Sequence, residues 1–401
     1  MLAKEIKKEA FALKPHVIAI RRDLHRYPEP SQKEFRTQQK IIEELHAIGI
    51  TELKTYYKTG VAAIIRGSEL GKTIGIRADM DALYITENTG LAFSSANPGI
   101  AHSCGHDGHV AMLLGAARIL FKLKDKIKGS VKLIFQPAEE DGLNGGGSQW
   151  MIKEGVLTDD PKVDFVIGQH LAPHIPAGYI ASKSGPLFTT SDLFAIEILG
   201  KGGHSSAPHL AKDPIVCAAQ VILGLQTIVS RNIDPFDTVV LSVCVVEAGK
   251  RHNVIPDTAK LVGSARSYSE ESSFLCRKRI REIVEGICTA NDLTSKISFT
   301  KSYGPVINDE EMFEKCKQWV AATIGEEFFI EAQPQSSGED FSNFAAEIPG
   351  VYFLVGAKYG NGEPLVPHTP SFTFDEEALP YGIINLCAVA LNYLNFNDSG
   401  Q

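Results

Sequence analysis

The sequence has little of what marks disulfide-rich, membrane-spanning or nucleic-acid-binding proteins. Its seven cysteines are scattered over 401 residues without paired spacing, which favours reduced thiols and a cytoplasmic location. The best apolar run, 110–120, is too short for a bilayer and contains Arg118, so no membrane partner is expected. The net charge of −8 argues against nucleic acid, because phosphate binding requires a basic face.

The composition is that of an ordinary globular protein, with 44% hydrophobic and 22% charged residues. A chain of this length exceeds what one core normally organises, so two domains are expected. Strands alternating with helices predict an α/β domain with a mainly parallel sheet, formed by 1–185 and 303–401. Between these segments, 186–302 follows the order β-α-β-β-α-β, which predicts an inserted α+β, ferredoxin-like domain.

Residues 102–109, His-Ser-Cys-Gly-His-Asp-Gly-His, place five side chains of metal-binding type in eight positions. Cys104 and His106 are two residues apart, so in an extended loop they point the same way and form half of a soft metal site. An apolar helix is predicted over 110–123, with Asp107 as a plausible N-cap. A buried cysteine and satisfied histidines explain such a dense cluster poorly, so a metal site is predicted.

Polar residues also occur after several predicted strands. These are Asp79 and Asp81 after 73–78, Glu139 and Glu140 after 131–135, His170 after 164–168, and His368 after 351–355. Open α/β sheets bind ligands beyond the carboxyl ends of their strands. We therefore expect the carboxylates and His170 to reach the same rim as Cys104 and His106.

Taken together, the motifs resemble those of the dinuclear metallohydrolases that include aminoacylases, hippurate hydrolases, auxin-conjugate amidohydrolases and related carboxypeptidases. The resemblance is greatest to the branch with Cys-x-His ligands. The matching motifs are Arg77-Ala78-Asp79-Met80-Asp81-Ala82-Leu83, the 102–109 cluster, Pro137-Ala138-Glu139-Glu140, Gly202-Gly203-His204-Ser205, Asn253-Val254-Ile255-Pro256-Asp257, Gly338-Glu339-Asp340-Phe341 and Pro367-His368-Thr369-Pro370. They occur in family order and span nearly the whole chain.

The resemblance implies a role for each candidate residue. The implied ligands of two divalent metal ions are Cys104, His106, Glu140, His170 and His368, with Cys104 bridging the ions. Glu139 is implied as general base and acid, Asp79 and Asp81 as residues that orient ligating histidines, His204 as the group that stabilises the oxyanion, and Asn253 and Arg266 as substrate-binding residues. Three alternatives remain: a residue of a strand-end turn for Asp79, a loop residue without a role for His204, and a surface charge on a strand for Arg266.

The activity implied is metal-dependent hydrolysis of N-acyl amino acids, with a carboxypeptidase or dipeptidase as the close alternative. A thiolate and imidazoles favour zinc, nickel or cobalt, and the added carboxylates admit manganese; zinc or manganese is expected first. The inserted domain is implied to be a lid and dimerisation domain, so a homodimer or higher homo-oligomer is expected. A non-catalytic, metal-stabilised binding protein is the alternative of another class, and the presence of every expected ligand and of Glu139 disfavours it.

Overall fold

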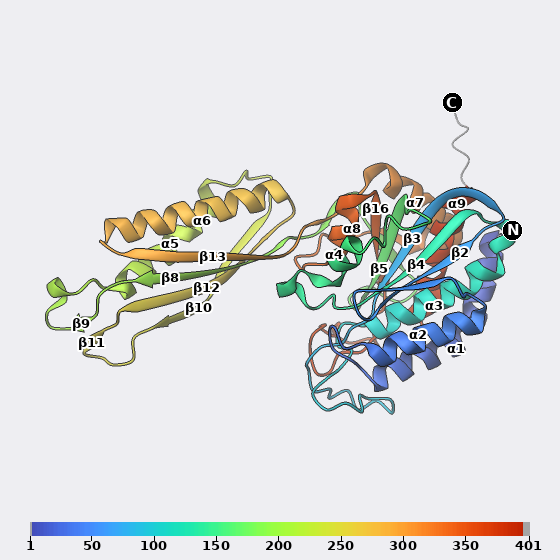
Figure 1. The fold of residues 1–401 in the computed structure, drawn as a ribbon, viewed down its shortest axis with the longest axis horizontal. Coiled ribbons are helices and arrows are strands. Elements are labelled where there is room, and N and C mark those ends of the chain that lie inside the picture. The colour runs from blue at the N-terminus through green and yellow to red at the C-terminus, as the bar shows by residue number, and fades with distance from the viewer. Residues whose placement is uncertain (1, 396–401) are drawn as a thin grey trace. The chain divides into compact units, whose positions relative to one another are not determined.

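The computed structural model describes residues 2–395, and the chain divides into two compact units. Unit 1 is formed by Met1–Leu187, Ile307–Pro334 and Asp340–Gln401, and unit 2 by Phe188–Val306 and Gln335–Glu339. The short segment 335–339, which the sequence patterns left within the α/β domain, therefore belongs to unit 2. Figure 1 shows the elements of both units, which are described separately below.

Unit 1 is built on an eight-stranded sheet in the order β1-β2-β4-β3-β5-β16-β6-β15. The strands are β1 Leu53–Tyr56, β2 Gly60–Arg66, β3 Glu69–Asp79, β4 Lys128–Gln136, β5 Phe165–Ala172, β6 Ile180–Ser182, β15 Phe329–Glu331 and β16 Gly350–Gly356. The four central strands, β4, β3, β5 and β16, are mutually parallel. This confirms the predicted α/β fold, and it brings the carboxyl ends of these strands to one edge.

Helices flank this sheet. They are α1 Leu2–Arg26, α2 Phe35–Ile48, α3 His106–Lys122, α4 Gly146–Lys153, α7 Glu310–Ile324, α8 Phe341–Glu347 and α9 Ala378–Asn395. Helices α1, α3 and α9 pack together, and α4 packs with α8. The side chains of β3 alternate between the two faces of the sheet. Ile74 and Ile76 enter the core that includes α9, whereas Arg77 points to the face where Asp340 lies.

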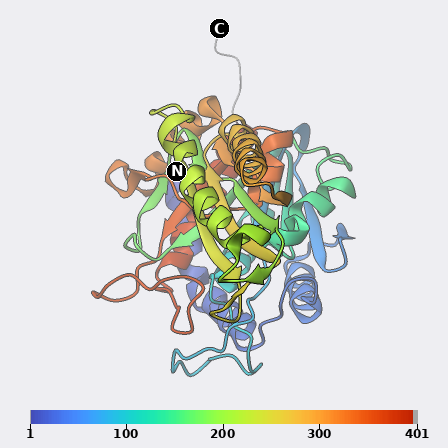
Figure 2. The ribbon, with the colours of Figure 1, turned by 90° about the vertical axis from the view of Figure 1, so that its left-hand side faces the viewer.

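Unit 2 contains an antiparallel sheet in the order β10-β12-β8-β13, covered on one face by two helices. The elements are β8 Ser191–Leu199, α5 Pro214–Arg231, β10 Val239–Ala248, β12 Thr258–Ser267, α6 Glu270–Ala290 and β13 Thr294–Tyr303. Their order along the chain is the predicted β-α-β-β-α-β. Figure 2 shows α5 and α6 side by side, and both helices contribute apolar residues to the core of this unit.

Short strands complete the chain. A pair lies within unit 2, β9 Gly203–His204 and β11 Val254–Ile255, and β7 Gly185–Phe188 pairs with β14 Val306–Asn308. Within residues 2–395, α5 is the one helix whose length and composition would suit a membrane span. That is weak evidence, because its inner face, which includes Cys217 and Leu225, lies in the core of unit 2.

Two local predictions were wrong. Helix α3 begins at His106, and its N-cap is Gly105 in the left-handed conformation (φ +90°) rather than Asp107. Asp107 lies instead within the first turn of α3. It is fully buried there, and its carboxylate pairs with Arg21 and His25 of α1. Strand β5 continues to Ala172 and so includes His170, which was expected to follow the strand.

Candidate metal centre

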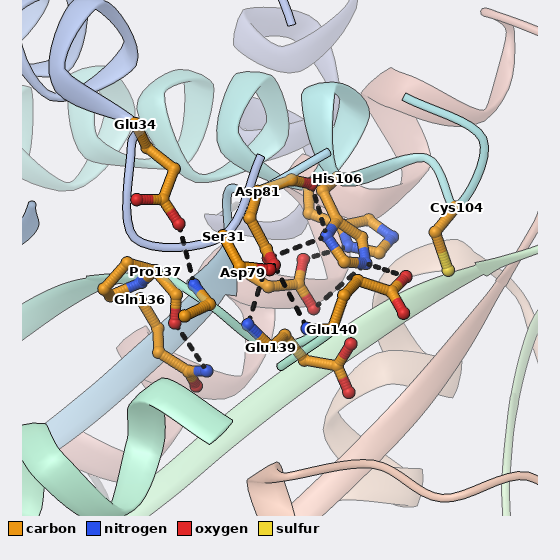
Figure 3. A network of polar contacts seen from close by, with 12 residues as sticks. Ser31, Glu34, Asp79, Asp81, Cys104, His106, Gln136, Pro137, Glu139 and Glu140 are labelled. Carbon is orange, nitrogen blue, oxygen red and sulfur yellow. Dashed lines mark hydrogen bonds and ion pairs between the residues drawn. The ribbon is translucent and has the colours of Figure 1, made fainter. Parts of the chain in front are cut away.

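The polar residues that follow the parallel strands converge with the start of α3 in unit 1. Asp79 ends β3, Glu139 and Glu140 follow β4, and His170 lies near the end of β5. Cys104 and His106 stand at the N-terminus of α3, and His368 comes from the loop after β16. The backbone N–H of His368 donates to the carbonyl of Ser103 at 2.8 Å, which fixes that loop beside the cluster. Figure 3 shows the carboxylate of Glu140 directed toward His106 on the side of Cys104.

Two groups of candidate ligands share Cys104. One is Cys104, His106 and His170, the other is Cys104, Glu140 and His368, and the ligand atoms within each group lie within 4.8 Å of one another. The Cys104 sulfur lies 3.4 Å from Nε2 of His170 and 3.3 Å from Nε2 of His368. Cys104 thus belongs to both groups, and its sulfur is of the ligand type that soft or borderline cations prefer.

The protonation preferences of His106 and His368 indicate that their surroundings favour positive charge. Nε2 of His106 is buried, and Oε1 of Glu140 lies 3.1 Å from Nε2 of His368. Burial opposes protonation of His106, yet the charges of Asp79 and Cys104 raise its pKa. Hydrogen bonds to Cys104 and Glu140 raise the pKa of His368 to about 10. A metal ion can supply the positive charge that these groups favour, so the residues fit a metal site.

Backbone carbonyls orient two of the rings. Nδ1 of His106 donates to the carbonyl of Asp81 at 2.9 Å, and Nδ1 of His170 donates to that of Leu171 at 2.8 Å. Because a carbonyl can only accept, the proton lies on Nδ1 in each ring and Nε2 faces the centre. Burial and the neighbouring His109 lower the pKa of His170 to about 3, so this ring is neutral at pH 7 and can act as a ligand.

His109 has a different environment, which the sequence did not reveal. Its Nδ1 lies 2.5 Å from Oδ1 of Asp79, and its Nε2 accepts the N–H of Leu171 at 3.0 Å. With both nitrogens bound by protein, His109 is not a ligand, but its ring packs edge-on against His170 with centroids 4.5 Å apart. Asp79, itself paired with Arg77 at 2.8 Å, therefore orients His109.

Asp81 holds the two glutamates through their backbone. Its carboxylate oxygens accept the N–H groups of Glu139 and Glu140, each at 3.1 Å, and the hydroxyl of Ser31 at 2.6 Å. Glu139 and Glu140 are thereby fixed as a pair, and Glu139 is 7% exposed. Glu139, His106 and Glu140 themselves form a group with ligand atoms within 4.8 Å, so Glu139 lies directly beside the candidate ligands.

Glu34, on the loop before α2, contacts the same turn and was not singled out from the sequence. Its carboxylate accepts the backbone N–H of Ala138 at 2.9 Å and the hydroxyl of Thr59 at 2.7 Å. Burial, and then the charge of Asp81, raises the pKa of Glu34 to about 7. No spacing along the chain links Glu34 to residue 138, so only the folded chain reveals the contact.

The other predicted site residues lie in unit 2. His204 on β9 pairs with Val254 on β11, and the N–H of Ser205 donates to the carbonyl of Asn253 at 3.1 Å. The exposed ring of His204 is oriented by Ser206, whose hydroxyl lies 2.7 Å from Nδ1. Arg266 lies on β12 and is half-buried, and burial lowers the pKa of its guanidinium. The fold thus brings His204 and Asn253 together.

The fold and this cluster define a metal-dependent hydrolase. The chain belongs to peptidase family M20/M25/M40, whose model matches residues 75–392. It is 38% identical to thermostable carboxypeptidase 1 of Saccharolobus solfataricus, over 98% of this chain and 99% of that protein. It is 43% identical to an N-acyl-L-amino acid amidohydrolase of Geobacillus stearothermophilus, over 78% of this chain and 83% of that one. A dinuclear metal-binding M20 peptidase of Bacillus subtilis has a similar structure, with a TM-score of 0.84, 35% identity and coverage of 96% and 99%.

Proposed function

We propose that the chain hydrolyses the amide bond of N-acyl amino acids with two divalent metal ions, zinc or manganese. The observation that carries this proposal is the Asp81-held pair of glutamates beside two ligand groups that share Cys104. Such a pair can combine a ligand and a general base in adjacent residues. The similarity to the Geobacillus stearothermophilus amidohydrolase supports N-acyl amino acids as the substrate class.

In this proposal Cys104, His106, Glu140, His170 and His368 hold the metal ions. Bound ions of this kind acidify a water molecule and polarise the scissile carbonyl. The carboxylate of Glu139 takes the proton of the attacking water and later gives it to the leaving amine. His109 and Asp79 hold His170, while the carbonyl of Asp81 orients His106.

The residues of unit 2 have their proposed roles on the substrate. His204 stabilises the oxyanion of the tetrahedral intermediate, and the orientation of its ring by Ser206 supports this role. Asn253 binds the substrate carbonyl, and Arg266 binds its carboxylate, for which a planar guanidinium offers two parallel hydrogen bonds.

A carboxypeptidase or dipeptidase with the same centre is the second candidate, and the similarity to the Saccharolobus solfataricus carboxypeptidase favours it. Both candidates involve the same bond type and the same residues. They differ in whether the group on the acyl side is a simple acid or an amino acid. The cytoplasmic location expected from the scattered cysteines stays a prediction.

A homodimer formed through unit 2 is also part of the proposal. Strand β10 is an edge of its sheet, and Val240, Val245 and Val246 on it are exposed. An apolar edge strand of this kind is a ready template for pairing with a second copy. Light scattering at several protein concentrations measures the oligomeric state, and a monomer at every concentration would contradict this part.

The test of the proposed reaction compares two adjacent substitutions of the same kind. Metal content and turnover are measured with N-acetyl amino acids, hippurate and dipeptides, with zinc or manganese added. Glu139→Gln is expected to keep about two ions per chain and to lose activity on the order of 10²–10⁴-fold, because only the proton carrier is changed. Glu140→Gln is expected to lose metal as well. Wild-type turnover by the Glu139→Gln variant would exclude Glu139 as the base.

A further inference from the structure

The turn that carries Glu139 and Glu140 is held by two buried carboxylates rather than one. Three consecutive backbone N–H groups donate to them, that of Ala138 to Glu34 and those of Glu139 and Glu140 to Asp81. Figure 3 shows Glu34 reaching the turn from a different loop than Asp81. Every N–H at the base of the proposed catalytic pair is thereby fixed by a side chain.

This turn needs such support because of its backbone conformation. Ala138 has φ +53°, in the left-handed region that residues with a Cβ rarely adopt. It is also buried, with 1% of its surface exposed. A non-glycine residue stays in this region only when its surroundings determine the conformation strongly. The hydrogen bond from its N–H to Glu34 is one such constraint, and the bond from the N–H of Gly147 to its carbonyl, at 2.9 Å, is another.

Glu34 is itself rigidly placed. Its side chain is fully buried, and the same oxygen that binds Ala138 also accepts the backbone N–H of Gln32 at 3.0 Å. Its other oxygen accepts the hydroxyl of Thr59, which is fully buried too. The carboxylate therefore has a single position, set by the loop before α2 and by the start of β2.

We propose that Glu34 is a positioning residue, which keeps Ala138 in its left-handed conformation so that Glu139 and Glu140 point to the metal centre. The inference rests on the proposed function for the roles of the two glutamates. It adds a residue outside the family motifs quoted above. The proposed role depends on the hydrogen bonds of the Glu34 carboxylate and not only on the space that the side chain fills.

The test uses Glu34→Leu, which removes both acceptor oxygens, and Glu34→Gln, which keeps an acceptor for Ala138. Glu29 provides the matched control, because its carboxylate accepts the backbone N–H groups of Arg36 and Thr37, at 3.1 and 2.8 Å, at the start of α2. Removing Glu29 as Glu29→Leu disturbs the same helix end but leaves the turn at Ala138 untouched. Glu34→Asp, which retracts the carboxylate while keeping its charge, serves if the leucine variant does not fold.

Three readouts are compared: zinc affinity by chelator competition, kcat and KM on an N-acetyl amino acid, and amide hydrogen exchange of 137–141. Glu34→Leu is expected to lose about 10–100-fold in zinc affinity, to lower kcat more than it raises KM, and to exchange faster in 137–141. Glu34→Gln is expected to stay close to the wild type in all three, and Glu29→Leu to leave the exchange of 137–141 unchanged. Glu34→Asp is expected to lie between the wild type and the leucine variant.

A second substitution separates positioning from general stability. Glycine adopts φ +53° at no steric cost, so adding Ala138→Gly to Glu34→Leu is expected to restore part of the lost zinc affinity and kcat. Wild-type affinity, kcat and exchange in Glu34→Leu would overturn the proposal, as would a loss that Ala138→Gly does not relieve and that Glu29→Leu reproduces. Wild-type protein without bound metal or turnover would contradict the proposed function, whereas the exchange of 137–141 would still decide whether Glu34 holds the turn.

Discussion

At the scale of single residues, His102 shows how burial can be the main determinant of a charge state. Its side chain is 2% exposed, and neither ring nitrogen has a hydrogen-bond partner. Burial lowers its pKa from 6.5 to about 4, so the ring is neutral at pH 7. The neighbouring Asp107 is instead ionised, because Arg21 and His25 outweigh the effect of burial and hold its pKa below its usual range. Two residues of one cluster thus have different charge states, because Asp107 has cationic partners that outweigh burial and His102 does not.

The folded chain should therefore lose stability in mild acid because of His102. Its pKa is lower in the folded state than in the unfolded state, so the unfolded chain binds more protons between pH 6.5 and 4. The stabilising contribution is fully present above pH 6.5 and is lost as the pH falls through this window, by about 2 kcal/mol at pH 5. Urea unfolding at pH 7 and pH 5 measures it, with His102→Gln as the variant that cannot titrate. Equal pH dependence in both proteins would contradict the assignment.

Ala138 gives a second expectation at this scale. Its left-handed backbone (φ +53°) costs about 1–2 kcal/mol for a residue with a Cβ. In the otherwise unchanged protein, Ala138→Gly should raise the free energy of unfolding by up to that amount, offset in part by the greater freedom of glycine in the unfolded chain. Denaturant unfolding measures the change, and a destabilised variant would mean that the methyl group of Ala138 has packing that outweighs the backbone cost.

At the scale of elements, the start of α4 packs closely on the turn after β4. A Cβ on Gly147 would overlap the carbonyl oxygen of Pro137, and one on Gly146, at φ +71°, would overlap the carboxylate of Asp340. Asp340 also accepts the N–H of Ser148 at 3.1 Å and pairs with Arg77 at 2.7 Å. The glycines at 146 and 147 thus allow α4 to pack closely on the residues that lead to Glu139.

Of two glycine-to-alanine substitutions in helices, one should therefore impair turnover and metal binding, and the other should only raise stability. Gly147→Ala is expected to displace the turn and to lower kcat/KM and zinc affinity by at least about 10-fold, as loss of a supporting contact does. Gly286→Ala in α6 has nothing within 4 Å of the added carbon. It should raise the free energy of unfolding by about 1 kcal/mol, because alanine is the better helix former, with turnover unchanged. Wild-type kinetics for Gly147→Ala would show that the turn does not depend on this packing.

At the scale of the whole molecule, each unit has its own hydrophobic core. That of unit 1 includes α1, α3, α9 and the central strands, and that of unit 2 is formed by α5, α6 and the antiparallel sheet. The candidate ligands all belong to unit 1. Metal binding should consequently stabilise one of the two cores directly.

Removal of metal is expected to lower the unfolding temperature of unit 1 and to leave the transition of unit 2 in place. A ligand at about 1,000 times its Kd stabilises the state that binds it by about 4 kcal/mol. Differential scanning calorimetry with and without a chelator separates the two transitions. Glu140→Gln, which loses a candidate ligand, should show a smaller shift. Equal displacement of both transitions would mean that the units unfold together.

Much of this architecture could be predicted from the sequence because the patterns involved are local. Apolar strands alternating with helices predict a parallel sheet, and the carboxyl ends of parallel strands lie at one edge, so the convergence of 79–81, 139–140 and 170 followed from strand order alone. The family follows from motifs in a fixed order. Glu139 and all the proposed ligands except His170 lie within these motifs, and their roles stay predictions.

Only the tertiary structure decided which atoms meet. Whether His109 is a ligand depends on the N–H of Leu171, 62 residues further along the chain. The start of α3 at Gly105 depends on a left-handed residue and on the contacts of Asp107 with α1. The contact of Glu34 with Ala138 joins residues 104 positions apart. Periodicity reports which face of an element is apolar, but hydrogen bonds between distant segments depend on how the elements pack, and no local pattern contains that information.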